Sequence, residues 1–211
     1  MADLAQQYPL EDQWALLAEH RIEYLFHGLW VESGNADEVS ALLRVDPDSR
    51  QECGLEAATE TFQASSGEMV WMGAHSPGWT HILASGLYPY HPAIRHLGKR
   101  RVFEIRYNDH LKELEPVNLY YDGEHVGDVT PPYEEGGYME LPDYRPYASG
   151  IALGDPLDLS RCLHLMLCMV GRITGRFLDR EWSTSTRALY RIPEGTWQEA
   201  STRSADLSPD A

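Results

Sequence analysis

The feature that most constrains the fold is a β-hairpin signal between residues 117 and 129. Residues 117–121 and 124–129 carry alternating strand-forming side chains, and the dipeptide Asp122-Gly123 lies between them. An Asp-Gly pair is typical of the tight turn that joins two antiparallel strands, because both turn residues need a positive φ. The sequence therefore predicts an antiparallel hairpin at this position.

A second hairpin is predicted upstream. Residues 69–73 and 79–84 have strand composition, and the turn segment Ser76-Pro77-Gly78 separates them. A further strand is predicted at residues 103–107, where apolar and charged side chains alternate as in a sheet with one dry face. Shorter strands are predicted at 22–27, ended by Gly28, and at 188–191.

Helical spacing of apolar residues, with capping residues at the ends, is found between these strands. The predicted helices cover residues 10–19, 36–45 after an Asn35 cap, 55–64 and 92–97 from Pro92, and the longest one is opened by Asp155, Pro156 and Asp158 and ended by Gly175. Hairpin-linked strands with helices before and after them predict the α+β class: a mainly antiparallel sheet covered on one face by helices. We expect one domain over residues 1–192 and a disordered C-terminal tail over 193–211, which is polar and rich in Ser, Thr and Ala.

Charge limits the classes of partner. The 211 residues include 33 acids and 17 bases, for a net charge of −16. This balance argues against direct nucleic-acid binding and against an anionic membrane surface, because both need clustered Lys and Arg. The start of the chain has no signal-peptide pattern, and the three cysteines form no C-x-x-C pair, so a cytoplasmic protein with free thiols is predicted.

The segment 130–154 is the strongest candidate for a functional surface. It is too long for an ordinary connection, and it interleaves tyrosines with acids. Residues 113–144 hold nine acids and no Lys or Arg. The candidate partner-binding residues are Tyr133, Glu134, Glu135, Tyr138, Glu140, Asp143, Tyr144 and Tyr147. Two plainer interpretations stay open: an acidic face that only keeps the protein soluble, and rings that pack the loop onto its own domain.

The leading hypothesis is a non-enzymatic protein-interaction module that binds a basic protein surface. We expect the chain to be an immunity, defence-associated or regulatory partner protein that holds no cofactor. Tyrosine supports this hypothesis because it supplies rigid, amphipathic contact area at interfaces. As a further alternative, the same acidic and aromatic surface could mimic nucleic acid and so bind a basic protein. Association of two copies through an exposed strand, giving a homodimer, is also open.

The alternative hypothesis is a small-molecule enzyme or ligand-binding domain with a pocket between the sheet and the long helix. Its candidate ligand-binding residues, chosen by residue type, are His81, Arg106, Tyr107 and His164. His164 has a structural interpretation too, because it lies mid-helix beside the apolar face. The sequence contains no G-x-S-x-G elbow and no glycine-rich nucleotide loop, so no catalytic set is predicted.

Nine histidines raise the question of a metal. His75 and His81 flank the Pro-Gly turn, where opposed strands would bring their rings together, and His91 and His96 lie five residues apart. Neither spacing matches a helical His pair, and no cysteine set completes four ligands. No metal site is predicted.

The chain contains, in order, RIEYLFHGL, DEVSALLRV, GWTHIL and GRITGRFLDREWSTSTRALYRIP. The order of these four segments resembles that of an actinobacterial protein family of unknown function. The resemblance covers about Arg21 to Pro193 and implies an actinobacterial cytoplasmic protein, in keeping with two lysines against fifteen arginines. Two segments differ from the family pattern: residues 30–35 are extra sequence before the helix, and the tyrosine-rich loop is longer than the corresponding loop of the family. The resemblance brings no catalytic residues.

Overall fold

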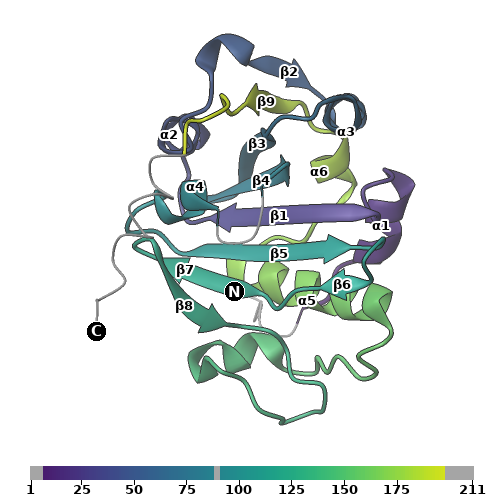
Figure 1. Cartoon of the computed structure of the whole chain (residues 1–211). Helices are drawn as coiled ribbons and strands as arrows, with labels where there is room; N and C mark the ends of the chain where they lie inside the picture. Colours follow the sequence, from purple (N-terminus) through teal and green to yellow (C-terminus); the bar gives the residue numbers. More distant parts are fainter. Residues whose placement is uncertain (1–6, 88–90, 198–211) are drawn as a thin grey trace, which may run out of the picture.

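A computed structural model describes residues 7–87 and 91–197 (Figure 1). Nine strands among these residues form one antiparallel sheet in the order β2-β9-β3-β4-β1-β5-β7-β8, with β6 paired to β5. The strands are β1 (Leu25–Val31), β2 (Gln51–Cys53), β3 (Met69–Ser76), β4 (Trp79–Ser85), β5 (Val102–Asn108), β6 (Glu113–Leu114), β7 (Asn118–Tyr121), β8 (Glu124–Asp128) and β9 (Arg187–Arg191). The helices are α1 (Gln13–Glu19), α2 (Ala36–Leu42), α3 (Leu55–Ala64), α4 (Pro92–Arg95), α5 (Leu159–Thr174) and α6 (Arg180–Thr184), with 3-10 helices η2 (Pro47–Ser49) and η3 (Pro142–Ala148). The predicted α+β class with an antiparallel sheet is confirmed.

Both predicted hairpins are present, as β3–β4 and β7–β8. In the second hairpin, Asp122 and Gly123 have φ values of +52° and +82°. Two positive φ values in succession give the turn whose twist matches that of the flanking strands. The local sequence therefore determines this turn.

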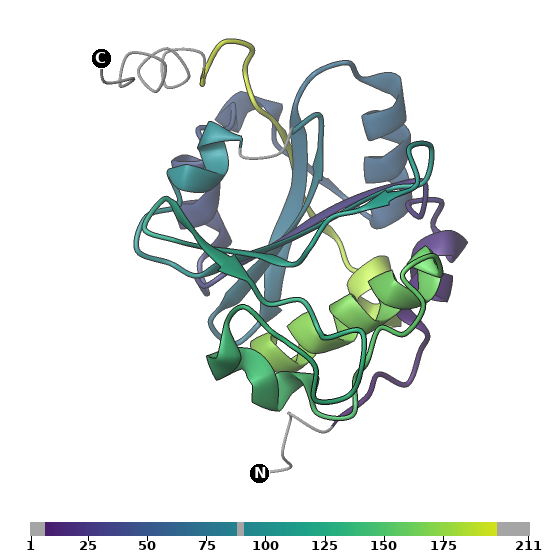
Figure 2. The ribbon, with the colours of Figure 1, turned by 60° about the horizontal axis from the view of Figure 1, so that its bottom comes forward.

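Helices α1, α3, α5 and α6 cover one face of the sheet, and the short helices α2 and α4 lie against the other (Figure 2). The larger core contains Trp30, Trp71 and Trp182, which are all at most 1% exposed. The second core contains aliphatic side chains such as Val39 and Ile82 together with the rings of Tyr120, Tyr190 and Trp197. Because alternate residues of a strand point to opposite faces, each central strand supplies both cores.

Strand β1 differs from its prediction. It begins at Leu25 and continues to Val31, so Gly28 lies inside the strand rather than ending it. A Cβ atom on Gly28 would lie 2.6 Å from the ring of Phe26 and 3.0 Å from that of Trp30. Glycine is needed there because two large rings on the same face close over its position.

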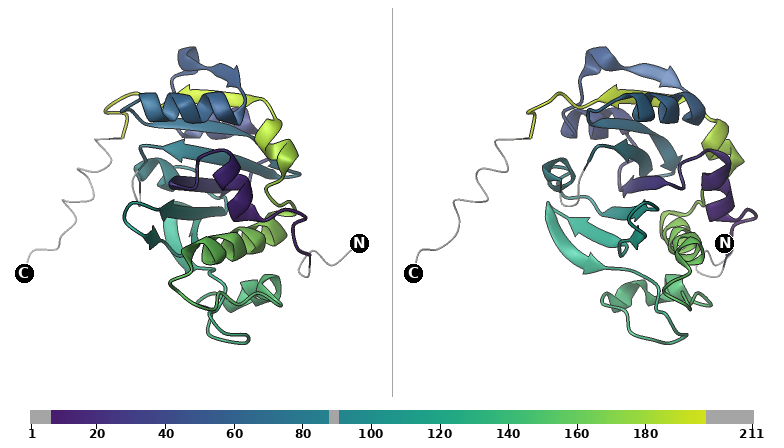
Figure 3. Two further views of the ribbon diagram at one scale, coloured as in Figure 1. Left: turned by 90° about the vertical axis from the view of Figure 1, so that its right-hand side faces the viewer. Right: turned by 45° about the vertical axis from the view of Figure 1, so that its right-hand side comes forward.

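Helix α5 has both predicted ends. The Asp158 carboxylate accepts a hydrogen bond from the backbone N–H of Arg161, 3.1 Å away, at the first turn. Gly175 follows the last turn with a φ of +82°, the left-handed conformation that favours glycine. The helix packs along the lower half of the sheet, beside α1 and η3 (Figure 3).

The disordered tail predicted from Pro193 is wrong for residues 193–197, which the structure describes. Trp197 is 4% exposed, its ring lies 4.8 Å from that of His96, and the Arg44 guanidinium lies 4.4 Å above it. The rest of the predicted tail, residues 198–211, lies outside the described residues. Across the described ranges, every helix is too short or too polar to cross a membrane.

Candidate functional site

The loop predicted to bind a partner is anchored to the domain at its base. Met139, Ile151 and Leu153 are buried in the larger core. The backbone N–H of Leu153 donates to the carbonyl of Pro132, and that of Gly154 to the carbonyl of Tyr133, both at 2.9 Å. The two ends of the loop are therefore held side by side.

The outer part of the loop is ordered by its own hydrogen bonds. The N–H of Gly137 donates to the carbonyl of Glu134 at 2.9 Å, which closes a turn. From η3, Arg145 Nη1 donates to the Gly137 carbonyl at 3.1 Å. The sequence indicated an irregular segment here, whereas the structure contains a 3-10 helix and a braced turn.

The four candidate tyrosines divide into two pairs. Tyr133 and Tyr138 are 52% and 84% exposed. Tyr144 and Tyr147 pack against the larger core, and the Tyr144 ring lies 5.7 Å from that of Phe103 in an edge-to-face arrangement. The candidate acids Glu134, Glu135, Glu140 and Asp143 are all exposed. One pair of tyrosines is thus available to a partner, and the other pair packs the loop onto its own domain. The exposed surface of the loop consists of two tyrosines and four carboxylates.

Arg172 ties this loop to helix α5. Its side chain is 1% exposed, and Nη1 donates to the carbonyls of Tyr147 and Ser149 at 2.8 and 2.7 Å. Its Nε donates to the carbonyl of Gln7 at 2.7 Å, and its guanidinium lies 4.6 Å from the Tyr8 ring. One buried arginine therefore joins the N-terminal segment, the loop and the long helix.

The four residues of the alternative hypothesis do not converge. His81 is buried and accepts a hydrogen bond from Trp182 Nε1 at 3.1 Å. Tyr107 donates to Asp109 at 2.6 Å, and His164 Nδ1 accepts from the backbone N–H of Gln13 at 3.0 Å. His81 therefore belongs to the core, Tyr107 to a turn and His164 to a helix end. All three lie on the α5 side of the sheet, where the larger core fills the space in which the pocket was predicted.

Arg106 lies on the opposite face, next to a buried polar network that the sequence did not reveal. His27 Nε2 is 2.8 Å from Glu104 Oε1, and Tyr120 donates its hydroxyl to Glu104 Oε2 at 2.9 Å. His27 and Glu104 are 4% and 1% exposed. Arg106 is the cross-strand neighbour of His27 and pairs with Glu115 at 2.9 Å. A carboxylate behind an imidazole fixes the ring orientation, so this is a positioned histidine.

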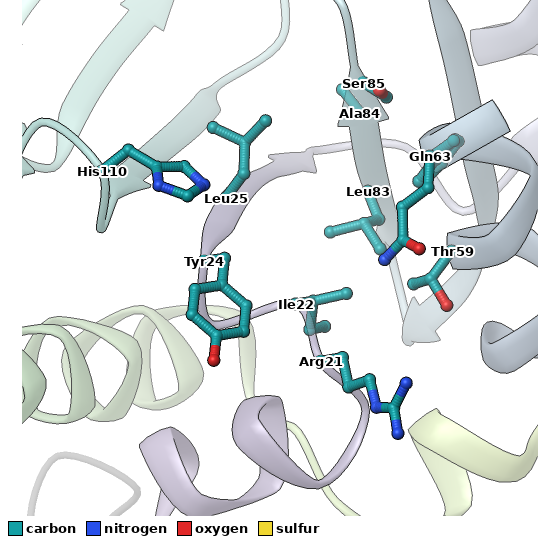
Figure 4. Close-up of a pocket in the computed structure, with 11 residues that line it drawn as sticks. Arg21, Ile22, Tyr24, Leu25, Thr59, Gln63, Leu83, Ala84, Ser85 and His110 are labelled. Atoms are coloured by element: carbon teal, nitrogen blue, oxygen red, sulfur yellow. The ribbon is translucent and has the colours of Figure 1, made fainter. Parts of the chain in front are cut away.

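Two cavities meet at the strand ends beside this network. A cavity of about 260 Å³ is lined by His27, Arg106 and Glu115 together with apolar side chains such as Phe26 and Leu87. An apolar cavity of about 410 Å³ adjoins it at Leu25, Ala84 and Ser85. Figure 4 shows the apolar cavity, with Tyr24, Leu25 and His110 on one side and Leu83 of β4 with Thr59 and Gln63 of α3 on the other.

The predicted approach of His75 and His81 is confirmed, with ring centroids 5.8 Å apart. Burial is the main cause that lowers the pKa of His75 to about 4, and burial also holds the pKa of His81 well below its ordinary value. Within residues 7–87 and 91–197, no three His, Cys, Asp or Glu side chains are grouped to hold a metal ion. The two rings therefore belong to the core as neutral groups.

No protein-family model, curated protein or solved structure matches the chain. The resemblance to an actinobacterial family accordingly stays a prediction.

Proposed function

We propose that the chain is a non-enzymatic protein-interaction module that binds a basic protein surface through residues 130–154. The observation that carries this proposal is the ordered loop that exposes Tyr133 and Tyr138 among four carboxylates. Tyrosine rings contribute large contact area with little conformational entropy to lose. The surrounding carboxylates complement a basic surface and increase the rate of encounter with it.

The anchors of the loop support the same proposal. A loop that is fixed before binding loses less conformational entropy in the complex than a flexible one does. Here the ends are bridged through Leu153 and Gly154, the outer turn is braced by Arg145, and Arg172 holds the exit of η3. For a protein with such a surface we propose a role as an immunity, defence-associated or regulatory partner protein.

The test compares two double variants as baits. Tyr133→Ala with Tyr138→Ala removes the exposed loop rings and leaves the packed pair, Tyr144 and Tyr147, in place. Tyr24→Ala with Tyr121→Ala is the matched control, because those rings are 52% and 47% exposed but lie outside the loop. Proteins recovered from an actinobacterial lysate are quantified by mass spectrometry, and the dissociation constant of the recovered protein is then measured after purification.

We expect the loop variant to lose affinity at least tenfold, which is the effect of removing an interface hot spot. The control variant is expected to bind as the wild type does. Binding is also expected to weaken as salt is raised, because the loop carboxylates act through charge. Equal affinity of both double variants for the partner would contradict the proposal.

A second function, small-molecule binding, is favoured by one observation: the apolar cavity adjoins the cavity that is lined by the positioned His27. Thr59→Trp places a ring at the wall of the apolar cavity, and Thr61→Trp on the same helix does not line it. Anilinonaphthalene sulfonate fluorescence is expected to report binding to the wild type and to the Thr61 variant only. Binding that persists in the Thr59 variant would exclude this cavity.

The sheet ends at β2 and β8, so these are the edges through which two copies would pair. The homodimer stays a prediction. Light scattering of the purified protein gives the molar mass in solution, which distinguishes a monomer from a dimer.

A further inference from the structure

Arg187 is a buried cation at the start of β9. It is 6% exposed, and its guanidinium lies 5.0 Å from the Trp71 ring. Its aliphatic stem lies across Gly73, where a Cβ atom would come within 3.1 Å of the arginine Cγ. The glycine and the ring hold the side chain flat against the sheet, so the position of its guanidinium is fixed.

The hydrogen bonds of Arg187 leave part of the guanidinium unused. Its Nε donates to Ser185 Oγ at 3.0 Å, and Nη1 has a longer contact of 3.5 Å to the Gly73 carbonyl. Within the described ranges, Nη2 has no hydrogen-bond partner and no carboxylate lies within ion-pair distance of the group. The N–H groups of Nη2 are therefore available to a ligand.

The nearest acids are already engaged. Asp179 and Glu181 pair with Arg176 at 2.9 and 3.0 Å, and Arg176 also donates to the His75 carbonyl at 3.1 Å. Burial first, and the charge of Arg176 second, lower the pKa of Arg187 to about 10. The group is still charged at neutral pH, and it lacks the counter-ion that a buried charge normally has.

Arg187 also forms part of the wall of a cavity of about 460 Å³ beside the β3–β4 turn. The same cavity is lined by Ser185, by His75, which presents a neutral ring, and by Arg176 together with the Glu181 carboxylate that it pairs at 3.0 Å. This volume lies within the range of small-molecule sites, about 300 to 1,000 Å³. The cavity thus combines suitable size with an unpaired guanidinium.

We propose that this cavity binds a small molecule that bears a carboxylate or phosphate group, with Arg187 as the residue that recognises the oxyanion. A guanidinium presents parallel N–H groups that match two oxygens of either anion. Arg176 at the same wall is already paired with Asp179 and Glu181, so Arg187 supplies the unpaired positive charge of the site. The site lies on β3, β9 and the α6 region, away from the loop at residues 130–154, so it is independent of the proposed protein-binding function.

The experiment measures binding of inorganic phosphate and of acetate to the full chain by calorimetry at constant ionic strength. We expect saturable binding of at least one anion to the wild type and at least tenfold weaker binding to Arg187→Gln. Arg191→Gln is the control, because Arg191 is an exposed arginine that pairs with Asp46 at 2.9 Å and does not line this cavity. Preference for phosphate or for acetate identifies the anionic group of the ligand.

A second measurement keeps the proposal testable if the Arg187 variant does not fold. The Nε resonance of Arg187 in the ¹⁵N-labelled wild type is expected to shift saturably with the anion that binds. An unmoved Arg187 resonance, absence of saturable binding of both anions, or equal binding by a folded Arg187→Gln variant would overturn the proposal.

Discussion

Acidification is expected to destabilise the protein through His75, which the fold buries in its neutral form. The ring is 2% exposed, and its Nε2 donates to the Arg176 carbonyl at 2.9 Å. Burial is the largest cause that lowers the pKa of His75, to about 4, and the charges of Arg187 and Arg176 act in the same direction. The hydrogen bond to the carbonyl and the charge of Asp179 oppose them.

The sign and the size follow from proton binding. In the unfolded chain the imidazole binds its proton near pH 6.5, whereas in the folded chain it does so near pH 4. Between these values the unfolded state holds more protons, so the free energy of unfolding decreases as the pH falls. A tenfold change in proton affinity corresponds to about 1.4 kcal/mol, so His75 alone accounts for a loss of about 3 kcal/mol between pH 7 and pH 4.

Urea unfolding of the wild type and of His75→Gln at several pH values isolates this contribution. The glutamine variant cannot titrate at this position, while every other group titrates in both proteins. The stability advantage of the wild type is therefore expected to shrink by about 3 kcal/mol from pH 7 to pH 4. His110→Gln, at an exposed ring, is the control for the histidine-to-glutamine exchange itself. A wild-type advantage that stays constant over this range would refute the assignment of His75 as a neutral buried group.

Three further outcomes are expected. Arg172→Met leaves three backbone carbonyls without their donor, so the free energy of unfolding, measured by thermal unfolding, should fall by about 3 kcal/mol. Proteolysis should also become faster in the 145–150 segment, and unchanged cleavage would argue against Arg172 as the anchor of the loop. Gly171→Ala places a methyl group against the Phe177 ring, and the overpacking should cost about 1–3 kcal/mol in urea unfolding; a neutral result would mean that the ring moves freely. Burial raises the pKa of the Cys168 thiol to about 12, so iodoacetamide at pH 8 should modify half-exposed Cys53 first, and early labelling of Cys168 would contradict its burial.

Local signals predicted the fold well. The Asp122-Gly123 turn, the Asn35 cap of α2 and the left-handed Gly175 after α5 are each specified by one or two residues, and each is present. Strands β2 and β6 were missed because three and two residues leave no periodic pattern to detect. The 3-10 helix η3 was missed because prolines at its start and inside it read as loop composition.

The candidate sites depended on longer-range information. The exposure of Tyr133 and the burial of Tyr144 are not distinguishable from composition, because both rings lie in the same proline-rich segment. His27 and Glu104 are 77 residues apart and meet only because β1 and β5 are neighbours in the sheet. Arg106 was selected from its residue type, and the register of β1 with β5 places it next to His27. Strand order, which a single sequence does not specify, supplies that site.

The position of β9 has a consequence for biosynthesis. This strand lies in the interior of the sheet, between β2 and β3, although its residues follow all the other strands in the chain. During translation, the nascent polypeptide must hold β3 with one open edge until Arg187 to Arg191 have been made. An unpaired edge of this kind readily accepts a strand from another molecule. Premature termination before residue 187 is therefore expected to give an aggregating product, even though nearly all of the larger core has already been synthesised.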